Sequence, residues 1–112
     1  MAKSNTQFVH HVYFWLKNTG NAADTAGLIE GLKKLSNVPT IKTFNIGTPA
    51  GTNRGVIDTT YAASWLCLFD SPEDQDIYQT HPIHLKFIED CGHLWEKVIV
   101  YDSVSINFKN SF

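Results

Sequence analysis

Three side chains that can transfer protons lie close together in the segment Tyr78–His84. They are Tyr78, His81 and His84, and Pro82 follows directly after the first histidine. An imidazole titrates near neutral pH and can act as a general base, while a phenol can hydrogen-bond a carbonyl oxygen. The segment therefore fits a proton-transfer pair formed by Tyr78 with either histidine.

The same two histidines also have the spacing of zinc ligands on one helical turn. A zinc site needs three or four ligands, and the sequence has no HExxH or CxxC motif to supply the others. Cys91 and His93 are two residues apart, so a helix would point them in different directions. His10 and His11 are neighbours on an expected strand, so only one of them can face a given site. We predict no bound metal.

A structural role is the remaining interpretation of this segment. His81 can end one helical segment, and Pro82 suits the first position of the next one.

Other catalytic motifs are missing: there is no G-x-S-x-G elbow, and no G-x-G-x-x-G or P-loop for a nucleotide, so we expect no cofactor. Cys67 lies mid-strand among apolar neighbours, which indicates an unreactive thiol.

The elements that must position these side chains alternate between strands and helices. Strands rich in β-branched and aromatic residues are expected over residues 8–17, 40–47, 61–70 and 96–108, with a loop over 48–59. A first helix is expected from Ala22, with Gly27 and Gly31 weakening it and Pro39 ending it. A second begins after the N-cap Ser71, is interrupted near Pro82 and resumes over residues 85–95. The order β-α-β-β-α-β predicts an α+β, ferredoxin-like fold with a four-stranded antiparallel sheet.

The third and fourth strands are apolar on both sides. Ala63, Trp65, Cys67 and Phe69 alternate with Leu66 and Leu68, and Val98, Val100 and Val104 alternate with Ile99 and Tyr101. Two helices cover only one face of such a sheet, and an antiparallel sheet with a solvated face usually alternates between apolar and polar residues. We therefore expect a homodimer in which the two sheets face each other, since two-fold dimers are the commonest assembly. The alternative is that the second face is the wall of a monomeric pocket.

Length and charge narrow the class of protein. The chain has 112 residues, a net charge of -2 and scattered basic residues. We predict a single domain over residues 1–112 that binds no nucleic acid, because nucleic-acid binders carry a basic patch. The sequence has no apolar run long enough to span a membrane and no secretory signal, and its two cysteines make no disulfide framework. These features predict a cytoplasmic protein.

Motifs occur at both ends of the chain. The first strand carries the pattern H-x-V-x-F-x-L-K, and the C-terminal half carries Y-x-x-H-P-x-H followed by W-E-K. In this sequence the motifs are His10, Val12, Phe14, Leu16 and Lys17, then Tyr78, His81, Pro82 and His84, then Trp95, Glu96 and Lys97. They resemble the motifs of the stress-responsive A/B barrel (Dabb) domain family. The resemblance covers nearly the whole chain and implies a ferredoxin-like protomer that forms a dimeric α+β barrel.

Among the members of this family, the chain is distantly similar to olivetolic acid cyclase, a plant polyketide cyclase. That likeness implies an aldol-type reaction with His84 as the base and Tyr78 as the hydroxyl that orients a carbonyl group. It also places His10, and not His11, at the pocket. The pattern departs from the cyclase at Ala63, where a histidine is expected, and at Trp65, which would narrow the cavity against a long alkyl substrate.

The predicted pocket lies between the sheet and the helices. Besides His84 and Tyr78, its expected ligand-binding residues are His10, Val12, Phe14, Trp65, Cys67, Val98 and Val100. The functional hypothesis is a dimer that binds a small apolar carbonyl compound, with cyclase- or lyase-like chemistry by the His/Tyr pair. The main alternative is a non-catalytic, stress-associated binding or structural oligomer, and a weaker one is a metal or haem binder.

Overall fold

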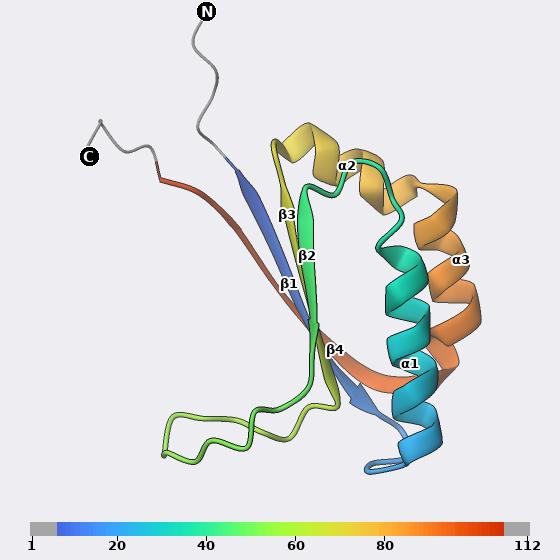
Figure 1. Cartoon of the computed structure of the whole chain (residues 1–112), viewed down its shortest axis with the longest axis vertical. Coiled ribbons are helices and arrows are strands. Elements are labelled where there is room, and N and C mark those ends of the chain that lie inside the picture. The colour runs from blue at the N-terminus through green and yellow to red at the C-terminus, as the bar shows by residue number, and fades with distance from the viewer. Residues whose placement is uncertain (1–6, 107–112) are drawn as a thin grey trace, which may run out of the picture.

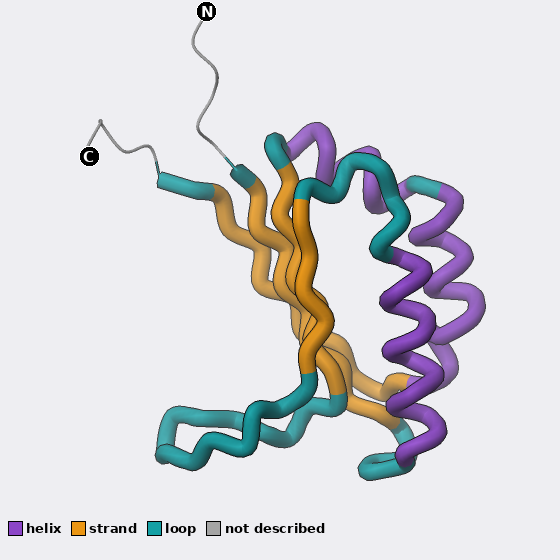
Figure 2. Tube along the Cα trace, viewed as in Figure 1, coloured by secondary structure: helices purple, strands orange, loops and turns teal. Residues whose placement is uncertain are grey.

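A four-stranded antiparallel sheet with helices on one face makes up the computed structural model, which describes residues 7–106 (Figure 1; Figure 2). The strand order is β2-β3-β1-β4, and every neighbouring pair is antiparallel. In chain order the elements are β1 (Phe8–Leu16), α1 (Ala22–Leu35), β2 (Thr43–Gly47), β3 (Ala63–Phe69), α2 (Pro72–Thr80), α3 (Pro82–Cys91), the 3-10 turn η1 (Gly92–Leu94) and β4 (Trp95–Val104). This is the predicted ferredoxin-like order.

The register of the sheet decides which side chains face the helices. Ile46, Trp65, Val12 and Val100 form one row across the four strands, because each is the direct partner of the next. Successive side chains on a strand point to opposite faces. Residues in phase with this row, such as Phe14 and Cys67, are therefore buried under the helices. The alternating pattern of the strands predicted this division of side chains between the two faces of the sheet.

Helix α1 covers this face through residues at helical spacing. Leu28, Leu32 and Leu35 are buried, and the side chain of Asn21 caps the N-terminus by accepting a hydrogen bond from the Asp24 N–H at 2.9 Å. The helix ends at Leu35, so the prediction that Pro39 ends it was wrong. Two successive turns bridge the gap, with the Asn37 and Val38 N–H groups bonded to the carbonyls of Lys34 and Leu35.

His81 forms the junction between α2 and α3. It is the C-cap of α2 and the N-cap of α3, and its Nδ1 atom accepts the Ile83 N–H at 3.0 Å. This confirms the predicted helix junction at His81 and Pro82. The helix resumes at Pro82, as the junction predicted, because proline needs no N–H partner in the first helical turn; the start at residue 85 that the element pattern suggested was too late. His81 is therefore not on a helical face shared with Tyr78.

Several strand ends also differ from the prediction. β2 begins at Thr43 and β3 at Ala63, each later than expected. β4 begins at Trp95, where a helical segment was expected, and ends at Val104. The predicted extension of this last strand reaches residues 107 and 108, which lie outside the described residues.

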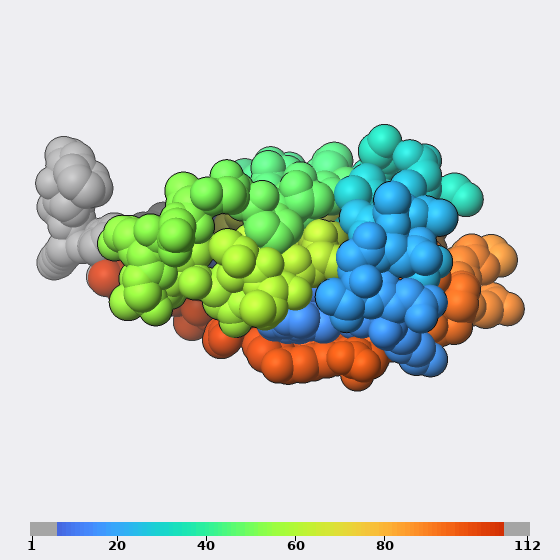
Figure 3. Space-filling model, turned by 90° about the horizontal axis from the view of Figure 1, so that it is seen from below, coloured from blue at the N-terminus to red at the C-terminus, as the bar shows by residue number. Residues whose placement is uncertain are grey.

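Within residues 7–106, no helix covers the second face of the sheet (Figure 1). Leu66, His11 and Tyr101 form the central row of this open face, with Asn45 beside them on β2. The loop between β2 and β3, residues 48–62, projects away from the helices on the same side as this face, as the end-on view also shows (Figure 3). The open face and the projecting loop are therefore neighbouring features.

Candidate active site

A cavity of about 420 Å³ lies between the sheet and helices α2 and α3. Eight of the nine residues predicted to form the pocket border it. They are His10, Val12, Phe14, Trp65, Tyr78, His84, Val98 and Val100. The strands supply an apolar floor because these residues share the helix-facing phase of β1, β3 and β4, while α2 and α3 bring Tyr78 and His84 over it. The structure thus brings the two proposed catalytic side chains to one cavity.

Cys67 is the exception. It is fully buried on β3, its side chain lies next to Tyr78, and it does not border the cavity. Burial raises the pKa of its thiol far above the ordinary value, so the thiol stays protonated. The structure supports an unreactive Cys67 and removes it from the cavity wall where we expected it.

Tyr78 is the most buried polar group of the site, with only 1% of the residue exposed. Its hydroxyl oxygen accepts a hydrogen bond from the Trp65 Nε1–H at 2.9 Å, and its ring packs edge-on against His84 with 4.7 Å between centroids. Burial, and secondarily the neighbouring Cys67, raise the pKa of the phenol well above its ordinary value. Tyr78 is therefore a neutral hydrogen-bond donor at physiological pH and not a base.

His84 follows Pro82 in the first turn of α3 and is half-buried. Its Nδ1 atom is buried and has no hydrogen-bond partner among the described residues. Burial is the main cause that lowers its pKa below 6.5, and His10 lowers it further, while the backbone of Gln79 acts in the opposite direction. At neutral pH His84 is thus an uncharged imidazole that can accept a proton.

A third polar group at the cavity comes from the strands. His10 is 5% exposed, and its Nδ1 atom lies 2.7 Å from Oδ1 of Asp102, a side chain that is 44% exposed. A carboxylate only accepts hydrogen bonds, so this contact places a proton on the Nδ1 atom of His10. The ring of His10 also lies edge-on to Tyr78, with 5.6 Å between centroids.

Sequence reasoning assigned no role to Asp102. Its signal was present, because Asp102 has the same phase as Val98, Val100 and Val104 and is the only polar residue of that phase between positions 98 and 104. Pairing β4 with β1 in register would have placed it opposite His10. The other residues of the cavity wall that the prediction missed are Leu35, Gln79, Phe87, Ile88 and Trp95.

The cavity opens between α3 and β4. Ile88 on α3 and Val100 on β4 border it and are 44% and 45% exposed, although most other wall residues are buried. Asp102 is also partly exposed on β4. A ligand would therefore enter past apolar side chains and meet His10 and His84 inside.

His11 does not belong to this site. It lies on the open face of the sheet, where its ring stacks beside Tyr13 with 4.5 Å between centroids. His10 and His11 thus point to opposite faces, as the strand period requires.

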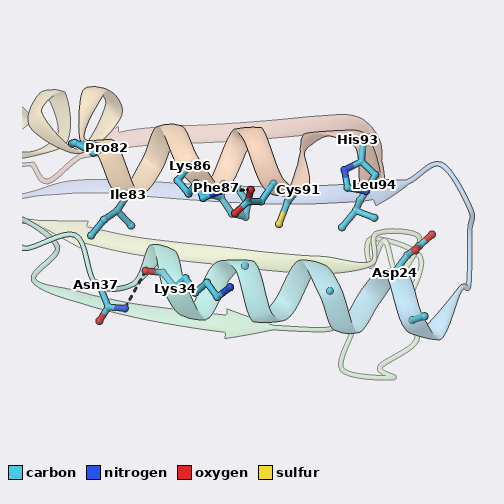
Figure 4. Close-up of a pocket in the computed structure, with 14 residues that line it drawn as sticks. Asp24, Lys34, Asn37, Pro82, Ile83, Lys86, Phe87, Cys91, His93 and Leu94 are labelled. Atoms are coloured by element: carbon cyan, nitrogen blue, oxygen red, sulfur yellow. Dashed lines mark hydrogen bonds and ion pairs between the residues drawn. The ribbon is translucent and has the colours of Figure 1, made fainter.

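A larger hollow of about 900 Å³ lies between α1 and α3 (Figure 4). Gly27 and Gly31 contribute no side chains to it, and charged residues such as Asp24, Lys34 and Lys86 surround it. None of the predicted site residues borders this hollow. Size alone therefore does not indicate the site, and the smaller cavity holds the groups that can do chemistry.

The family of the chain follows from comparison with known proteins. A family model described as "Stress responsive A/B Barrel Domain" (Dabb) matches residues 8–105. The chain belongs to this family. The match confirms the resemblance seen in the motifs, and it includes all elements of the sheet and both sides of the cavity.

Solved structures of this family and fold are similar over nearly their whole length. A Dabb family protein from Mesorhizobium loti has 23% identity and a TM-score of 0.74, covering 91% of this chain and 99% of that one. A dimeric ferredoxin-like protein of unknown function from Thermobifida fusca has 18% identity and a TM-score of 0.74, covering 92% and 94%. The hydroxynitrile lyase from Passiflora edulis has 19% identity and a TM-score of 0.73, covering 97% and 99%. At these identities the likeness establishes the fold.

No curated protein matches the chain. The solved structures and the family model do not show the distant similarity to olivetolic acid cyclase, which stays a prediction. Within residues 7–106, no helix has the length and apolar character needed to cross a membrane. Across the same range, no three His, Cys, Asp or Glu side chains gather closely enough to hold a metal ion.

Proposed function

We propose that this protein binds a small, apolar carbonyl compound in the cavity between sheet and helices and acts on it with His84 and Tyr78. The observation that carries the proposal is the meeting of an uncharged imidazole and an uncharged phenol, 4.7 Å apart, at one apolar cavity. A base and a hydrogen-bond donor at that distance fit proton abstraction next to a carbonyl group.

The proposed step moves one proton. The imidazole of His84 accepts a proton from the carbon next to the carbonyl group, so a C–H bond breaks and an N–H bond forms. The electron pair moves to the carbonyl oxygen, where the O–H of Tyr78 donates a hydrogen bond to the developing negative charge. Addition of this enolate to a second carbonyl group of the same molecule closes a ring, and His84 returns its proton to the new oxygen. The reverse sequence is a lyase reaction.

Trp65 and the His10–Asp102 pair support these roles. The Trp65 N–H occupies one lone pair of Tyr78 and fixes its oxygen. The Tyr78 O–H also has Cys67 as a hydrogen-bond partner, and in the proposed step it turns from this weak acceptor to the carbonyl oxygen of the ligand. Asp102 orients the ring of His10, which borders the same cavity. A lyase among the proteins of the same fold is consistent with this chemistry.

The rival function is a non-catalytic binding protein or structural oligomer. The near-complete burial of Tyr78 and its bond to Trp65 favour this rival, since both features also stabilise a core. Catalysis and simple binding therefore need separate tests.

A thermal-shift titration tests binding. We expect acetophenone, a small aryl ketone, to raise the melting temperature of the wild type, because a ligand that binds only the native state stabilises it by mass action. His84→Ala should reduce this shift, and His93→Ala, a loss of an exposed imidazole outside the cavity, should leave it unchanged. Equal shifts for wild type and His84→Ala would contradict binding at this site.

Proton exchange tests catalysis. In D₂O, abstraction of a methyl proton from acetophenone followed by return of a deuteron replaces hydrogen by deuterium, which proton NMR follows directly. We expect the wild type to accelerate this exchange over buffer. Binding without accelerated exchange would support the non-catalytic rival.

The assembly that we propose is a homodimer through the open face of the sheet. The face carries apolar side chains, including Val9, Leu66 and Ile99, without a helix to cover them in residues 7–106. Similar structures are described as dimeric. Light scattering should give twice the chain mass for the wild type and a lower mass for Leu66→Lys, which puts a charge at the centre of this face. A monomer mass for the wild type would refute the dimer.

A further inference from the structure

Cys67 lies against the phenol of the proposed site, although it does not border the cavity. It follows Trp65 and precedes Phe69 on the helix-facing side of β3, because alternate residues of a strand share one face. Tyr78 contacts both of these neighbours. Its hydroxyl oxygen accepts the Trp65 Nε1–H at 2.9 Å, and its ring centroid lies 5.2 Å from that of Phe69. The side chain of Tyr78 therefore spans the position of Cys67.

The hydroxyl group of Tyr78 has one proton to donate. A phenol has a single O–H donor, and its oxygen accepts hydrogen bonds through lone pairs. The Trp65 N–H uses a lone pair and not the proton, and the partner of the hydroxyl on the other side is the thiol of Cys67. Tyr78 is 1% exposed and Cys67 is 0% exposed, so water does not reach this contact.

The direction of the Tyr78 proton decides what the cavity offers to a ligand. Tyr78 and His84 border the cavity and Cys67 does not, so a proton directed at Sγ points out of the cavity and into the core. Sulfur is a weak acceptor, whereas a carbonyl oxygen is a strong one. A carbonyl group that reaches Tyr78 can therefore draw the proton away from the thiol.

From this arrangement we propose that Cys67 is a positioning residue, which holds the Tyr78 proton out of the cavity in the ligand-free protein and yields it to the carbonyl oxygen of a ligand. The inference rests on the proposed binding of a carbonyl compound at Tyr78. A weak acceptor suits this task, because it satisfies a buried donor before binding and costs little to replace. Trp65 holds the oxygen throughout, so only the O–H group turns.

The resting direction of the proton can be measured without a ligand. A hydroxyl proton on a residue that is 1% exposed should exchange slowly with water, so proton NMR at low temperature can detect it, and Tyr78→Phe assigns the signal by removing it. We expect stronger nuclear Overhauser contacts from this proton to the Hβ atoms of Cys67 than to the ring protons of His84. Stronger contacts to the His84 ring would overturn the role of Cys67, whether or not a ligand binds.

Two variants remove the acceptor in different ways. Cys67→Ala leaves a small space and Cys67→Val fills it, so an effect common to both comes from the lost acceptor and not from packing. Each leaves the buried Tyr78 donor without its partner, so the melting temperature without ligand should fall. Acetophenone should bind both variants about two- to tenfold more tightly, because no bond to sulfur has to be broken. Cys91→Ala removes the other buried thiol, which lies outside this cavity, and should leave the affinity unchanged.

The carbonyl stretching band of carbon-13-labelled acetophenone reports the hydrogen bond itself. Relative to hexane, we expect a lower frequency on the wild type, a still lower one on both Cys67 variants, and a value near that of hexane on Tyr78→Phe. A wild-type band at the hexane value would overturn the transfer of the bond to a ligand together with the proposed function. A lowered band and an affinity that are the same in wild type and both Cys67 variants would overturn the role of Cys67 alone.

Discussion

Trp65 of β3 donates its indole N–H to the hydroxyl of Tyr78 on α2, at 2.9 Å, and both residues are about 1% exposed. The bond joins the sheet to the helical layer at the wall of the proposed active site. The bond fixes the phenol oxygen through a lone pair and does not use the phenol proton, so one contact serves both stability and the proposed chemistry.

Replacing Trp65 by phenylalanine should destabilise the protein by about 2–4 kcal/mol. The change removes the indole N–H that donates to the buried Tyr78 oxygen and leaves space in a packed core. Urea unfolding measures the free energy of unfolding of the variant and the wild type. Trp15→Phe is the matched control, because that indole bonds the exposed Thr60, and it should cost less than about 1 kcal/mol. Equal losses would contradict a special role for the Trp65–Tyr78 bond.

The rate of acetophenone exchange should rise with pH through the lowered pKa of His84. This pKa lies below 6.5 mainly because of burial, so the base is protonated and inactive at low pH and free at neutral pH. The raised pKa of Tyr78 keeps the donor neutral, so no decline should follow near pH 8 to 9. Exchange rates measured from about pH 4.5 to 9 check this profile. A rate that increases on acidification would exclude His84 as the base.

Stability should fall as pH falls below 6.5. A histidine whose pKa is lower in the folded chain than in the unfolded chain binds its proton only at a lower pH when the chain is folded. Acidification therefore favours the unfolded chain at pH values between these two pKa values. His11, whose pKa is lowered by burial and by His10, acts in the same direction. Urea unfolding at pH 7 and pH 5 measures the loss, and His84→Gln should make it smaller. An unchanged loss in that variant would mean that His84 does not titrate as described.

Replacing two glycines of α1 by alanine should change the stability of the protein in opposite directions. A methyl group added at Gly27 would lie 3.8 Å from Cδ1 of Leu94, which is an ordinary contact distance. Gly27→Ala should therefore stabilise the helix by up to about 1 kcal/mol. At Gly31 a methyl group would collide with Sγ of Cys91 and lie 3.3 Å from the Phe87 ring. Gly31→Ala should therefore lower the melting temperature, because overpacking outweighs helix propensity. A gain for both variants would show that α1 and α3 separate easily.

The sequence predicted the sheet and its two faces because alternation along β1 and β3 is a local signal with a fixed period. It also predicted the junction at His81, since proline has few allowed positions in a helix. The ends of elements were less predictable: α1 stops at Leu35 through turns that the presence of Pro39 does not specify.

The lining of the cavity depends on tertiary contacts that local sequence patterns do not specify. Cys67 has the phase of a wall residue, but packing against Tyr78 keeps it away from the cavity, and this depends on how α2 crosses the sheet. Asp102 could have been found only by pairing β4 with β1 in the correct register.

The most direct test of the proposed function compares acetophenone deuteration by the wild type, His84→Ala and His93→Ala, with circular dichroism to show that each variant is folded. General-base catalysis contributes about a hundredfold or more, so His84→Ala should lose nearly all acceleration over buffer while His93→Ala keeps it. Wild-type rates in folded His84→Ala, or no acceleration by the wild type itself, would contradict a catalytic His84.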